Sequence, residues 1–287
     1  MLFDDKGDIW LRQSWLDTAF RCSERGRLAT IKPEWDNISS DSAIIGTGAH
    51  AGFEARVNEL NDREDVAPRD AIIGAIESEV ANGVKWTKYS TKQQLIDNAM
   101  RCYDAWEEGI LPEFIDRGLI YGARTEVSFR VPLYVRSCGR SVGITGTIDL
   151  VPDMNVLADW KTASQKFRPL EKQRHAIQPT IYSLAAVKGG LQSDDHDVDY
   201  HWPMNFTYGI AVRGETKATP QILTVRRTEE HALFAIARIK QLVDLALDYG
   251  LDRTWPTDDD HFLCSQTWCP WWTACKGAFN ISNEYPS

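Results

Sequence analysis

The chain reads Gly146-Thr147-Ile148-Asp149 and then, after nine further residues, Asp159-Trp160-Lys161-Thr162. Both stretches lie in runs rich in apolar and β-branched residues, so we expect strands over 142–151 and 155–161. Pro152-Asp153 is a typical turn dipeptide and should join them. Two strands linked by so short a turn are expected to lie side by side in one sheet.

Three charged side chains of these strands should meet on one face of the sheet. Because residues two apart on a strand face the same side, Asp159 and Lys161 should project together while Trp160 packs behind them. The neighbouring strand can set Asp149 beside the pair. Two carboxylates and an ammonium on one face suit a hard divalent cation and a cationic group that acts on phosphate.

The pattern on either side of this pair of strands predicts a chain of the α/β or α+β class. Apolar and polar residues alternate over 125–135, which predicts a strand, and 204–213 with 220–226 should form a hairpin. Helical periodicity and capping signals predict the helices. One begins at an N-cap Ser14, and a second runs to about Leu60 after a break in the chain at Gly46-Thr47-Gly48. Further helices are expected over 68–112, with a capping box at Thr91 and Gln94, over 173–188, and from an N-cap Thr228 to Tyr249.

Composition places the protein among ordinary globular chains. Its 287 residues allow one large or two modest domains, and 43% hydrophobic with 25% charged residues excludes disordered and fibrous classes. No apolar run approaches the roughly 20 residues of a membrane helix. The N-terminus is acidic, whereas a signal peptide would be basic and then apolar. We therefore expect a soluble, cytoplasmic protein that does not enter a membrane.

Positive charge is gathered in two windows of a chain whose net charge is −9. Residues 122–140 contain four arginines against one glutamate, and residues 160–175 contain five lysines and arginines against one glutamate. Since segregated charge attracts a ligand of opposite sign, an anionic partner should bind beside these windows. Chance clustering on solvated faces is the alternative.

Cysteine usage points to metal ligation. Cys264, Cys269 and Cys275 fall within twelve residues, and six cysteines are too few for a disulfide scaffold in a chain of this length. The spacing of the first two is compatible with a structural zinc site. Cys102 and Cys138 lack such neighbours and should be structural.

The motifs described above resemble those of the PD-(D/E)XK nuclease superfamily, specifically its RecB-like exonucleases. In that family a Gly-x-hydrophobic-Asp strand, an Asp-x-Lys strand and a helix with Gln-x-x-x-Tyr follow one another. Here these are Gly146 to Asp149, Asp159 to Lys161, and Gln178 to Tyr182. The family also places a metal-binding histidine on an earlier helix, a position that His50 matches.

The resemblance implies a restriction-endonuclease-like core, in which a central mixed sheet is flanked by helices. It implies a hydrolase that cleaves the phosphodiester bonds of DNA, an exonuclease that uses Mg²⁺ or Mn²⁺. The metal ligands would be His50, Asp149 and Asp159. The catalytic residues would be Asp149, Asp159, Lys161, Gln178 and Tyr182, and Lys166, Arg168 and Lys172 would contact the DNA.

A second part of the resemblance concerns the cysteines. In the iron–sulfur branch of the family, which includes AddB and a CRISPR-associated nuclease group, one cysteine near the start and three near the end bind a [4Fe–4S] cluster. Cys22, Cys264, Cys269 and Cys275 match that layout. The spacing between Cys264 and Cys269 is longer than the usual Cys-x-x-Cys. Trp268, Trp271 and Trp272 would form an apolar wall around the cluster.

No linker divides the chain, so we expect one catalytic domain with a helical insertion, and the resemblance adds the cluster-binding ends and the partners. One nuclease domain would occupy 1–287, with a helical insertion at 60–120, a nuclease core at 122–250, and cluster-binding ends at 14–30 and 251–280. The chain would process DNA ends for recombination or repair. It contains no Gly-x-x-x-x-Gly-Lys-Ser/Thr loop, so unwinding would depend on a partner such as a helicase or recombination protein.

The sequence is also compatible with two other classes of function. One is a non-catalytic DNA-binding module with a structural zinc or iron–sulfur site. The other is an iron–sulfur redox sensor, for which a complete set of nuclease motifs would have no purpose.

Overall fold

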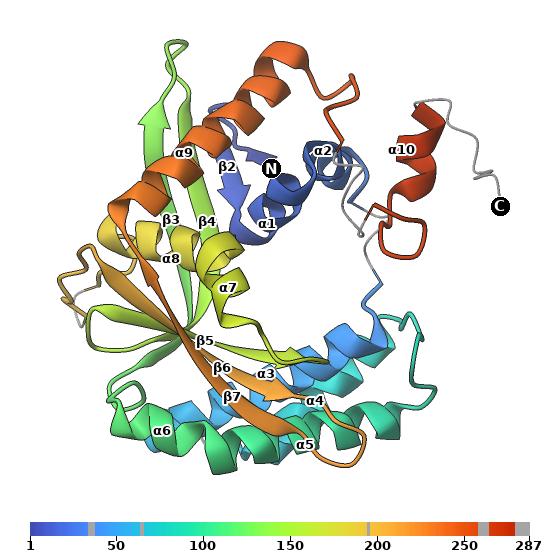
Figure 1. Cartoon of the computed structure of the whole chain (residues 1–287), viewed down its shortest axis with the longest axis vertical. Helices are drawn as coiled ribbons and strands as arrows, with labels where there is room; N and C mark the ends of the chain where they lie inside the picture. Colours follow the sequence, from blue (N-terminus) through green and yellow to red (C-terminus); the bar gives the residue numbers. More distant parts are fainter. Residues whose placement is uncertain (34–37, 64–65, 194–195, 258–263, 279–287) are drawn as a thin grey trace. The chain divides into compact units, whose positions relative to one another are not determined.

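The computed structural model describes residues 1–287 with the exception of 34–37, 64–65, 194–195, 258–263 and 279–287. The chain divides into two compact units (Figure 1). Unit 1 comprises Met1–Asn37, Pro132–Thr145 and Leu233–Ser287, and unit 2 comprises Ile38–Val131 and Gly146–Ala232. The domain boundaries expected from the sequence stay a prediction.

Unit 2 contains a mixed β-sheet. Strand β5 (Val156–Ala163) lies antiparallel to β4 (Ser141–Val151) and parallel to β6 (Met204–Val212). Strand β7 (Thr219–Arg227) continues the sheet antiparallel to β6, and β3 (Arg124–Val135) pairs with β4. The strands expected over 125–135, 142–151, 155–161, 204–213 and 220–226 are therefore confirmed.

Helices cover both faces of this sheet (Figure 1). One group packs an apolar core against β5 and β6, and this group comprises α3 (Asp41–Leu60), α4 (Pro68–Ala81), α5 (Lys92–Gly109) and α6 (Leu111–Asp116). The other face carries α7 (Pro169–His175) and α8 (Ile177–Val187). The expected α/β fold, a mixed sheet flanked by helices, is confirmed.

Helix α3 corrects one expectation. It runs without interruption from Asp41 through the Gly46-Thr47-Gly48 stretch, and the Ser40 hydroxyl caps it by accepting from the amide of Ala43. A Cβ atom at Gly48 would lie 2.7 Å from the side chain of Ile76 on α4. The glycine serves close helix packing rather than a break in the chain.

Two further helix boundaries differ from the expected ones. The stretch expected as one helix over 173–188 is two helices, because Ala176 between them has an extended backbone. The Arg227 guanidinium accounts for this break, since it donates to the carbonyls of Lys172, Gln173 and Ala176. Helix α1 begins at Gln13, with no side-chain cap, so Ser14 is not its N-cap.

The capping prediction for α5 is confirmed. The hydroxyl of Thr91 and the side chain of Gln94 form a capping box at the start of α5. Helix α9 (Glu229–Asp244) starts next to Thr228 and continues as a π-helical turn, Leu245–Tyr249, before Gly250. Gly250 has φ of 100°, a left-handed value that suits glycine at a helix end.

Unit 1 joins the two ends of the sequence. Strand β2 (Ile9–Arg12) pairs antiparallel with β1 (Leu2–Phe3) and parallel with residues 142–145 of β4. Helices α1 (Gln13–Arg21), α2 (Ser23–Ile31) and α10 (Trp272–Ala278) also belong to it.

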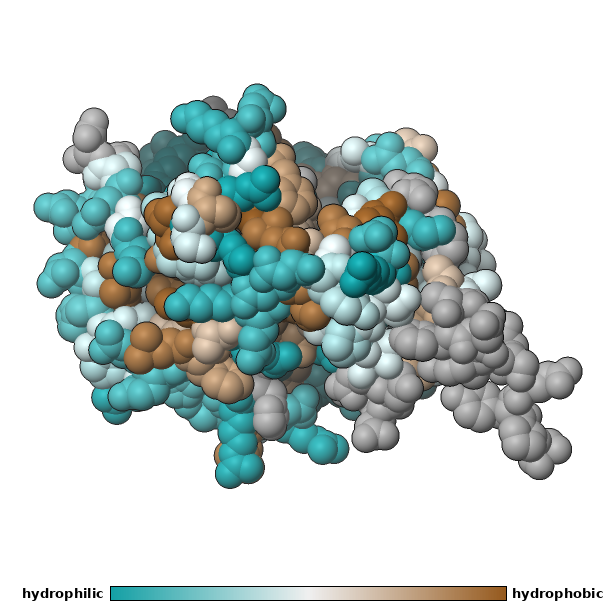
Figure 2. Space-filling model, turned by 90° about the horizontal axis from the view of Figure 1, so that it is seen from above, coloured by the Kyte–Doolittle hydropathy of each residue, from teal (hydrophilic) through white to brown (hydrophobic). Residues whose placement is uncertain are grey.

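The surface in Figure 2 mixes hydrophilic residues with small groups of hydrophobic ones. None of the helices described is both long and apolar enough to cross a membrane.

Candidate active site

Strand β5 supplies two of the charged side chains and a buried aromatic ring. Asp159 and Lys161 project to one face, whereas Trp160 is buried on the other, with its ring centroid 5.9 Å from that of Phe53 and 6.1 Å from that of Trp106. The alternation expected for this strand is therefore correct. The aromatic packing fixes β5 against α3 and α5 and so fixes where the charged side chains point.

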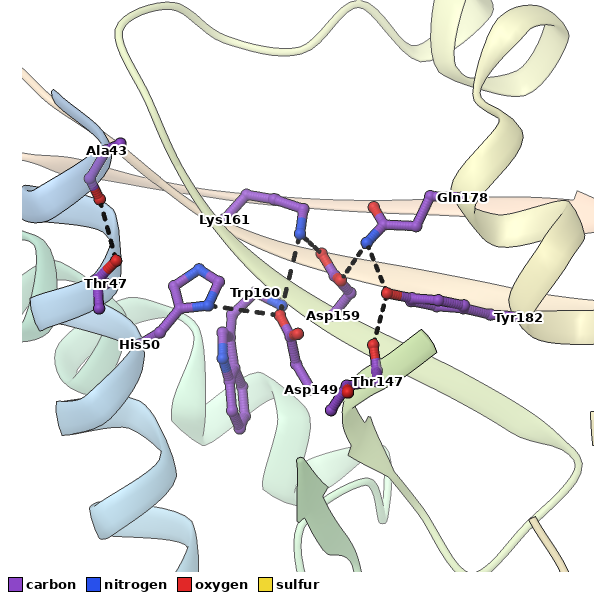
Figure 3. A network of polar contacts seen from close by, with 10 residues as sticks. All are labelled: Ala43, Thr47, His50, Thr147, Asp149, Asp159, Trp160, Lys161, Gln178 and Tyr182. Carbon is purple, nitrogen blue, oxygen red and sulfur yellow. Dashed lines mark hydrogen bonds and ion pairs between the residues drawn. The ribbon is translucent and has the colours of Figure 1, made fainter. Parts of the chain in front are cut away.

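The three charged groups of β4 and β5 lie together (Figure 3). Nζ of Lys161 is 2.7 Å from Oδ2 of Asp159 and 4.0 Å from Oδ2 of Asp149. The same oxygen of Asp149 accepts a hydrogen bond of 3.3 Å from the backbone amide of Trp160. Adjacent strands thus hold both carboxylates around one ammonium group.

Helix α8 completes this arrangement with two side chains one turn apart. The amide Nε2 of Gln178 donates to Oδ1 of Asp159 at 2.9 Å and to the hydroxyl oxygen of Tyr182 at 3.3 Å. The hydroxyl of Tyr182 donates to the carbonyl of Thr147 on β4 at 2.6 Å. Helix α8 is therefore tied to both strands that bear the carboxylates (Figure 3).

His50 on α3 lies beside Asp149, with 3.6 Å between Nδ1 and Oδ2. Burial, together with the nearby ammonium of Lys161, lowers the pKa of His50 to about 3. The imidazole is consequently neutral near pH 7, and one of its ring nitrogens retains a lone pair.

The pKa values of Asp149, Asp159 and Lys161 are all raised in this buried site. Burial and the neighbouring Asp149 raise the pKa of Asp159 to about 7, and burial raises the pKa of Asp149 despite the nearby Lys161. Burial would lower the pKa of Lys161, but Asp159 and Asp149 outweigh it and raise that pKa above its ordinary value. Lys161 therefore stays charged, while the carboxylates hold more negative charge than it balances.

One acidic residue near the site is missing from the set predicted from sequence. Glu126 on β3 has a pKa raised to about 7 by partial burial and by the charges of Asp149 and Glu54. Its φ of 48° is left-handed, a value uncommon for a residue with a side chain. Its place on the polar side of β3 was the available signal, but the same position suits an ordinary strand-edge charge.

The described residues contain no group of three His, Cys, Asp or Glu side chains arranged so that they could hold a metal ion as they stand. In the carboxylate site the ammonium of Lys161 lies close to both Asp149 and Asp159. The donor chemistry of His50, Asp149 and Asp159 nevertheless fits a cation, since two carboxylates with raised pKa values adjoin a neutral imidazole.

The four cysteines singled out in the sequence line one cavity of unit 1, with a volume of about 30 Å³. Cys22 comes from the junction of α1 and α2, and Cys264, Cys269 and Cys275 come from the C-terminal segment. The remaining two cysteines lie elsewhere: Cys102 is buried in the core of unit 2 and Cys138 is exposed.

Two of the three tryptophans expected around the cysteines are buried there. Trp272 lines the cavity, and Trp271 packs with Leu28 and Cys275. Trp268 is 60% exposed and so does not form part of an apolar wall.

The three basic residues expected to contact DNA border one pocket of unit 2. Lys166 and Arg168 lie in the loop that follows β5, and Lys172 lies on α7. The pocket has a volume of about 480 Å³ and begins at Thr162, directly after Lys161.

A solved structure with a TM-score above 0.5 agrees with this fold. A crystal structure of a candidate exonuclease from Eubacterium rectale is similar, with a TM-score of 0.53 and 10% sequence identity over 100% of this chain and 96% of that chain. The crystal structure of SSO0001 has a TM-score of 0.35 and 12% identity over 84% of this chain and 87% of that chain. No curated protein matches the sequence.

A family model gives the decisive match. Residues 18–276 match the PD-(D/E)XK nuclease superfamily, so the match includes both carboxylate strands, α8 and all four cysteines of the cavity. The expected restriction-endonuclease-like core is thereby confirmed. The chain belongs to the PD-(D/E)XK nuclease superfamily.

Proposed function

We propose that this chain is a metal-dependent DNA exonuclease that hydrolyses phosphodiester bonds and processes DNA ends for recombination or repair. Membership of a nuclease superfamily makes phosphodiester hydrolysis the class of reaction. The observation that carries the proposal is the unbroken series of contacts from Asp149 through Lys161 and Asp159 to Gln178. Two carboxylates, an ammonium and an amide thus meet at one point of the sheet.

His50, Asp149 and Asp159 would hold one or two Mg²⁺ or Mn²⁺ ions. Carboxylate oxygens are the ligands that hard cations prefer, and a nearby cation would favour the ionised form of both carboxyls, whose pKa values burial raises. When bound, the cation supplies a lowered pKa for water and neutralises charge that develops on the phosphate.

Lys161 and the residues of α8 have separate tasks in this proposal. Lys161 stays protonated, so it can orient the attacking water or donate to a phosphate oxygen in the transition state. Gln178 holds Oδ1 of Asp159 and so fixes that carboxylate. Tyr182 anchors α8 to Thr147 and keeps Gln178 in place.

Lys166, Arg168 and Lys172 would contact phosphates of the DNA strand. They border one pocket, and the strand that carries Asp159 and Lys161 leads directly into it. Phosphate contacts by lysine and arginine release counterions, so DNA affinity should fall steeply as salt rises. Unwinding of a duplex would be the task of a partner helicase or recombination protein.

The cysteine cavity of unit 1 would hold a [4Fe–4S] cluster, as in the iron–sulfur branch of RecB-like nucleases. Four thiolates are the usual complete set of ligands for such a cluster, and four cysteines line this one cavity. The second candidate is a structural zinc ion, with which the spacing of Cys264 and Cys269 is compatible. Both groups would tie the N-terminal helices to the C-terminal segment within unit 1.

A digestion experiment tests the exonuclease assignment. Linear DNA labelled at the 5′ or the 3′ end and a covalently closed circle of the same sequence are incubated with the protein and Mg²⁺ or Mn²⁺. We expect loss of linear DNA from one end, no cutting of the circle, and no reaction in EDTA. Cleavage of the circle would replace exonuclease by endonuclease, and an inert protein would favour the DNA-binding module.

Metal analysis of anaerobically purified protein tests the cluster. We expect a brown protein with about four irons per chain. Colourless protein with one zinc would leave the zinc assignment standing. A cleavage rate that changes with redox state, at constant stability, would favour a sensor.

A further inference from the structure

The loop between α4 and α5 combines an exposed aromatic ring with positive charge. Trp86 is 43% exposed, and Lys85 and Lys88 on either side of it are exposed as well. The stretch 82–90 contains no acidic residue. A single exposed tryptophan needs no explanation, but an aromatic ring between basic side chains is typical of surfaces that bind single-stranded nucleic acid.

The buried carboxylate of Asp41, the first residue of α3, fixes this loop. It accepts hydrogen bonds from the backbone amides of Thr87, Lys88 and Tyr89 at 2.8, 2.6 and 3.0 Å, and from the hydroxyl of Thr87 at 2.6 Å. Burial would raise the pKa of Asp41, but these hydrogen bonds outweigh it and lower that pKa below its ordinary value. An ionised carboxylate therefore holds three successive backbone amides next to Trp86.

The residue before Trp86 is fixed by the segment that leads into α3. The amide of Lys85 donates to the carbonyl of Ser39 at 2.9 Å, and the amide of Asp41 donates to the carbonyl of Lys85 at 3.2 Å. Val84 and Tyr89 pack against the apolar core of unit 2. The backbone is thus anchored on both sides of an exposed ring. A loop that is ordered before its ligand arrives lowers the entropic cost of binding.

This loop lies at the N-terminal end of the helix that carries His50. The first residue of α3 is about 14 Å from His50, at 1.5 Å per helical residue. Between them, the side of α3 that faces Lys161 in Figure 3 carries only small side chains, those of Ala43, Gly46 and Thr47. A Cβ atom at Gly46 would lie 3.2 Å from the hydroxyl of Thr162, the residue after Lys161. A strand bound at the carboxylates can therefore follow α3 towards the loop.

We infer that the loop 84–89 is a stacking subsite for single-stranded DNA, in which the ring of Trp86 stacks on a base while Lys85 and Lys88 contact the adjoining phosphates. The inference rests on the proposed nuclease function and deepens it, because it assigns a form to the substrate. A base inside a duplex has both faces covered by its neighbours, whereas an unpaired base offers a free face. The subsite therefore favours a single strand over a duplex.

Binding in EDTA tests the inference apart from cleavage. Fluorescence anisotropy measures the Kd of an oligothymidylate of about eight nucleotides, of a strand of the same length whose nucleotides are all abasic, and of a duplex, over a range of salt. The variants are Trp86→Ala, Trp86→Phe and Lys88→Gln.

Two controls match these variants. Tyr121→Ala removes another exposed aromatic ring of unit 2, at the opposite end of α3, where the amide of Gly122 donates to the side chain of Asn61. Lys188→Gln removes an exposed charge of the same unit. Circular dichroism establishes that each variant is folded.

We expect Trp86→Ala to weaken binding of the oligothymidylate about tenfold and to leave binding of the abasic strand and of the duplex unchanged, because only the stacked base is lost. Trp86→Phe should recover part of the affinity. Lys88→Gln should lower the slope of log Kd against log salt by about 0.7 for both single strands, since it removes a phosphate contact. Tyr121→Ala and Lys188→Gln should change neither quantity.

Two results would overturn the inference. One is a folded Trp86→Ala protein that binds the oligothymidylate as tightly as wild type does, and the other is an equal loss for the oligothymidylate and the abasic strand. Either result, with digestion of DNA by the wild type intact, would refute the subsite alone. A wild-type protein that binds none of the three DNAs would contradict the proposed function as well.

Discussion

Asp159 shows how the site depends on single atoms. Its side chain is fully buried, one oxygen lies 2.7 Å from the ammonium of Lys161, and the other accepts from the amide of Gln178. A carboxylate in such surroundings is unfavourable unless it is paired. Asp149 adds a second negative charge, so one ammonium balances only part of the total.

Mn²⁺ should therefore stabilise the protein more at pH 8 than at pH 6. The folded pKa of Asp159 is about 7 against an ordinary 3.8, so the folded state binds more protons, and the free energy of unfolding falls as pH rises from about 4 to 7. Mn²⁺ binds the ionised carboxylate and offsets the unfavourable free energy of burying its charge. The gain in the free energy of unfolding on adding Mn²⁺ should therefore be about 1 kcal/mol larger at pH 8 than at pH 6.

Thermal unfolding with Mn²⁺ and with EDTA at both pH values measures this difference. Asp159→Asn should remove most of it, whereas Asp116→Asn, an exposed change on α6, should preserve it. An equal gain in Tm at both pH values would contradict the charge balance described for the site.

Lys161→Ala should separate catalysis from metal binding. Loss of one preorganised cation that acts in the transition state reduces turnover by about 100-fold or more. The carboxylates remain, so Mn²⁺ binding measured by calorimetry should persist. If the variant loses metal binding and turnover together, Lys161 supports the ligands rather than the chemistry.

At the scale of elements, local patterns predicted much of the fold and the site. Alternation placed Asp159 and Lys161 opposite Trp160, and helical spacing placed Gln178 and Tyr182 on one face. Features that depend on distant packing were missed. The break between α7 and α8 depends on Arg227, which lies more than fifty residues along the chain from Lys172.

Glycines in helices illustrate the same limit. In the sequence, a glycine that ends a helix cannot be distinguished from a glycine that allows another helix to pack closely. Only the packed structure distinguishes the two. Gly48 allows the side chain of Ile76 to pack against α3, and Gly26 allows α1 to pack closely against α2.

Alanine at two helical glycines should change stability in opposite directions. A Cβ at Gly26 would lie 2.5 Å from Cβ and 3.0 Å from Cα of Ala19, so Gly26→Ala should lower the free energy of unfolding by about 1–3 kcal/mol. Gly74 on α4 has open space, so Gly74→Ala should raise it by about 0.5–1 kcal/mol. Denaturant unfolding of both variants measures this, and equal signs would refute the packing argument.

At the scale of the whole molecule, unit 1 joins the ends of the sequence with protein contacts as well as with its cysteine cavity. Buried Arg27 forms a two-bond pair with Glu24, at 2.6 and 2.7 Å, and donates to the carbonyl of Leu251 at 2.8 Å. The backbone amide of Trp255 donates to the carboxylate of Glu24. The backbone amide of Glu24 donates to the carbonyl of Pro256. Long-range closure of this kind is invisible to local sequence patterns.

Glu24→Gln should destabilise the protein by about 3–5 kcal/mol, because it leaves the buried Arg27 without its charge partner. The variants should be compared at equal metal content, because Glu24 also lines the cysteine cavity. Asp17→Asn, which breaks an exposed pair with Arg21, is the control and should cost below about 1 kcal/mol. Similar losses for the two variants would show that the buried pair contributes little.

The central claim is that the carboxylates of β4 and β5 hydrolyse phosphodiester bonds with a divalent cation. The most direct measurement is the single-turnover rate of nucleotide release from linear DNA in Mn²⁺ by wild type, Asp149→Asn, Asp159→Asn and the exposed control Asp116→Asn. We predict that wild type and the control cleave equally fast, while both site variants, folded by circular dichroism, lose about 1,000-fold or more in rate. Wild-type rates in either site variant would contradict the assignment.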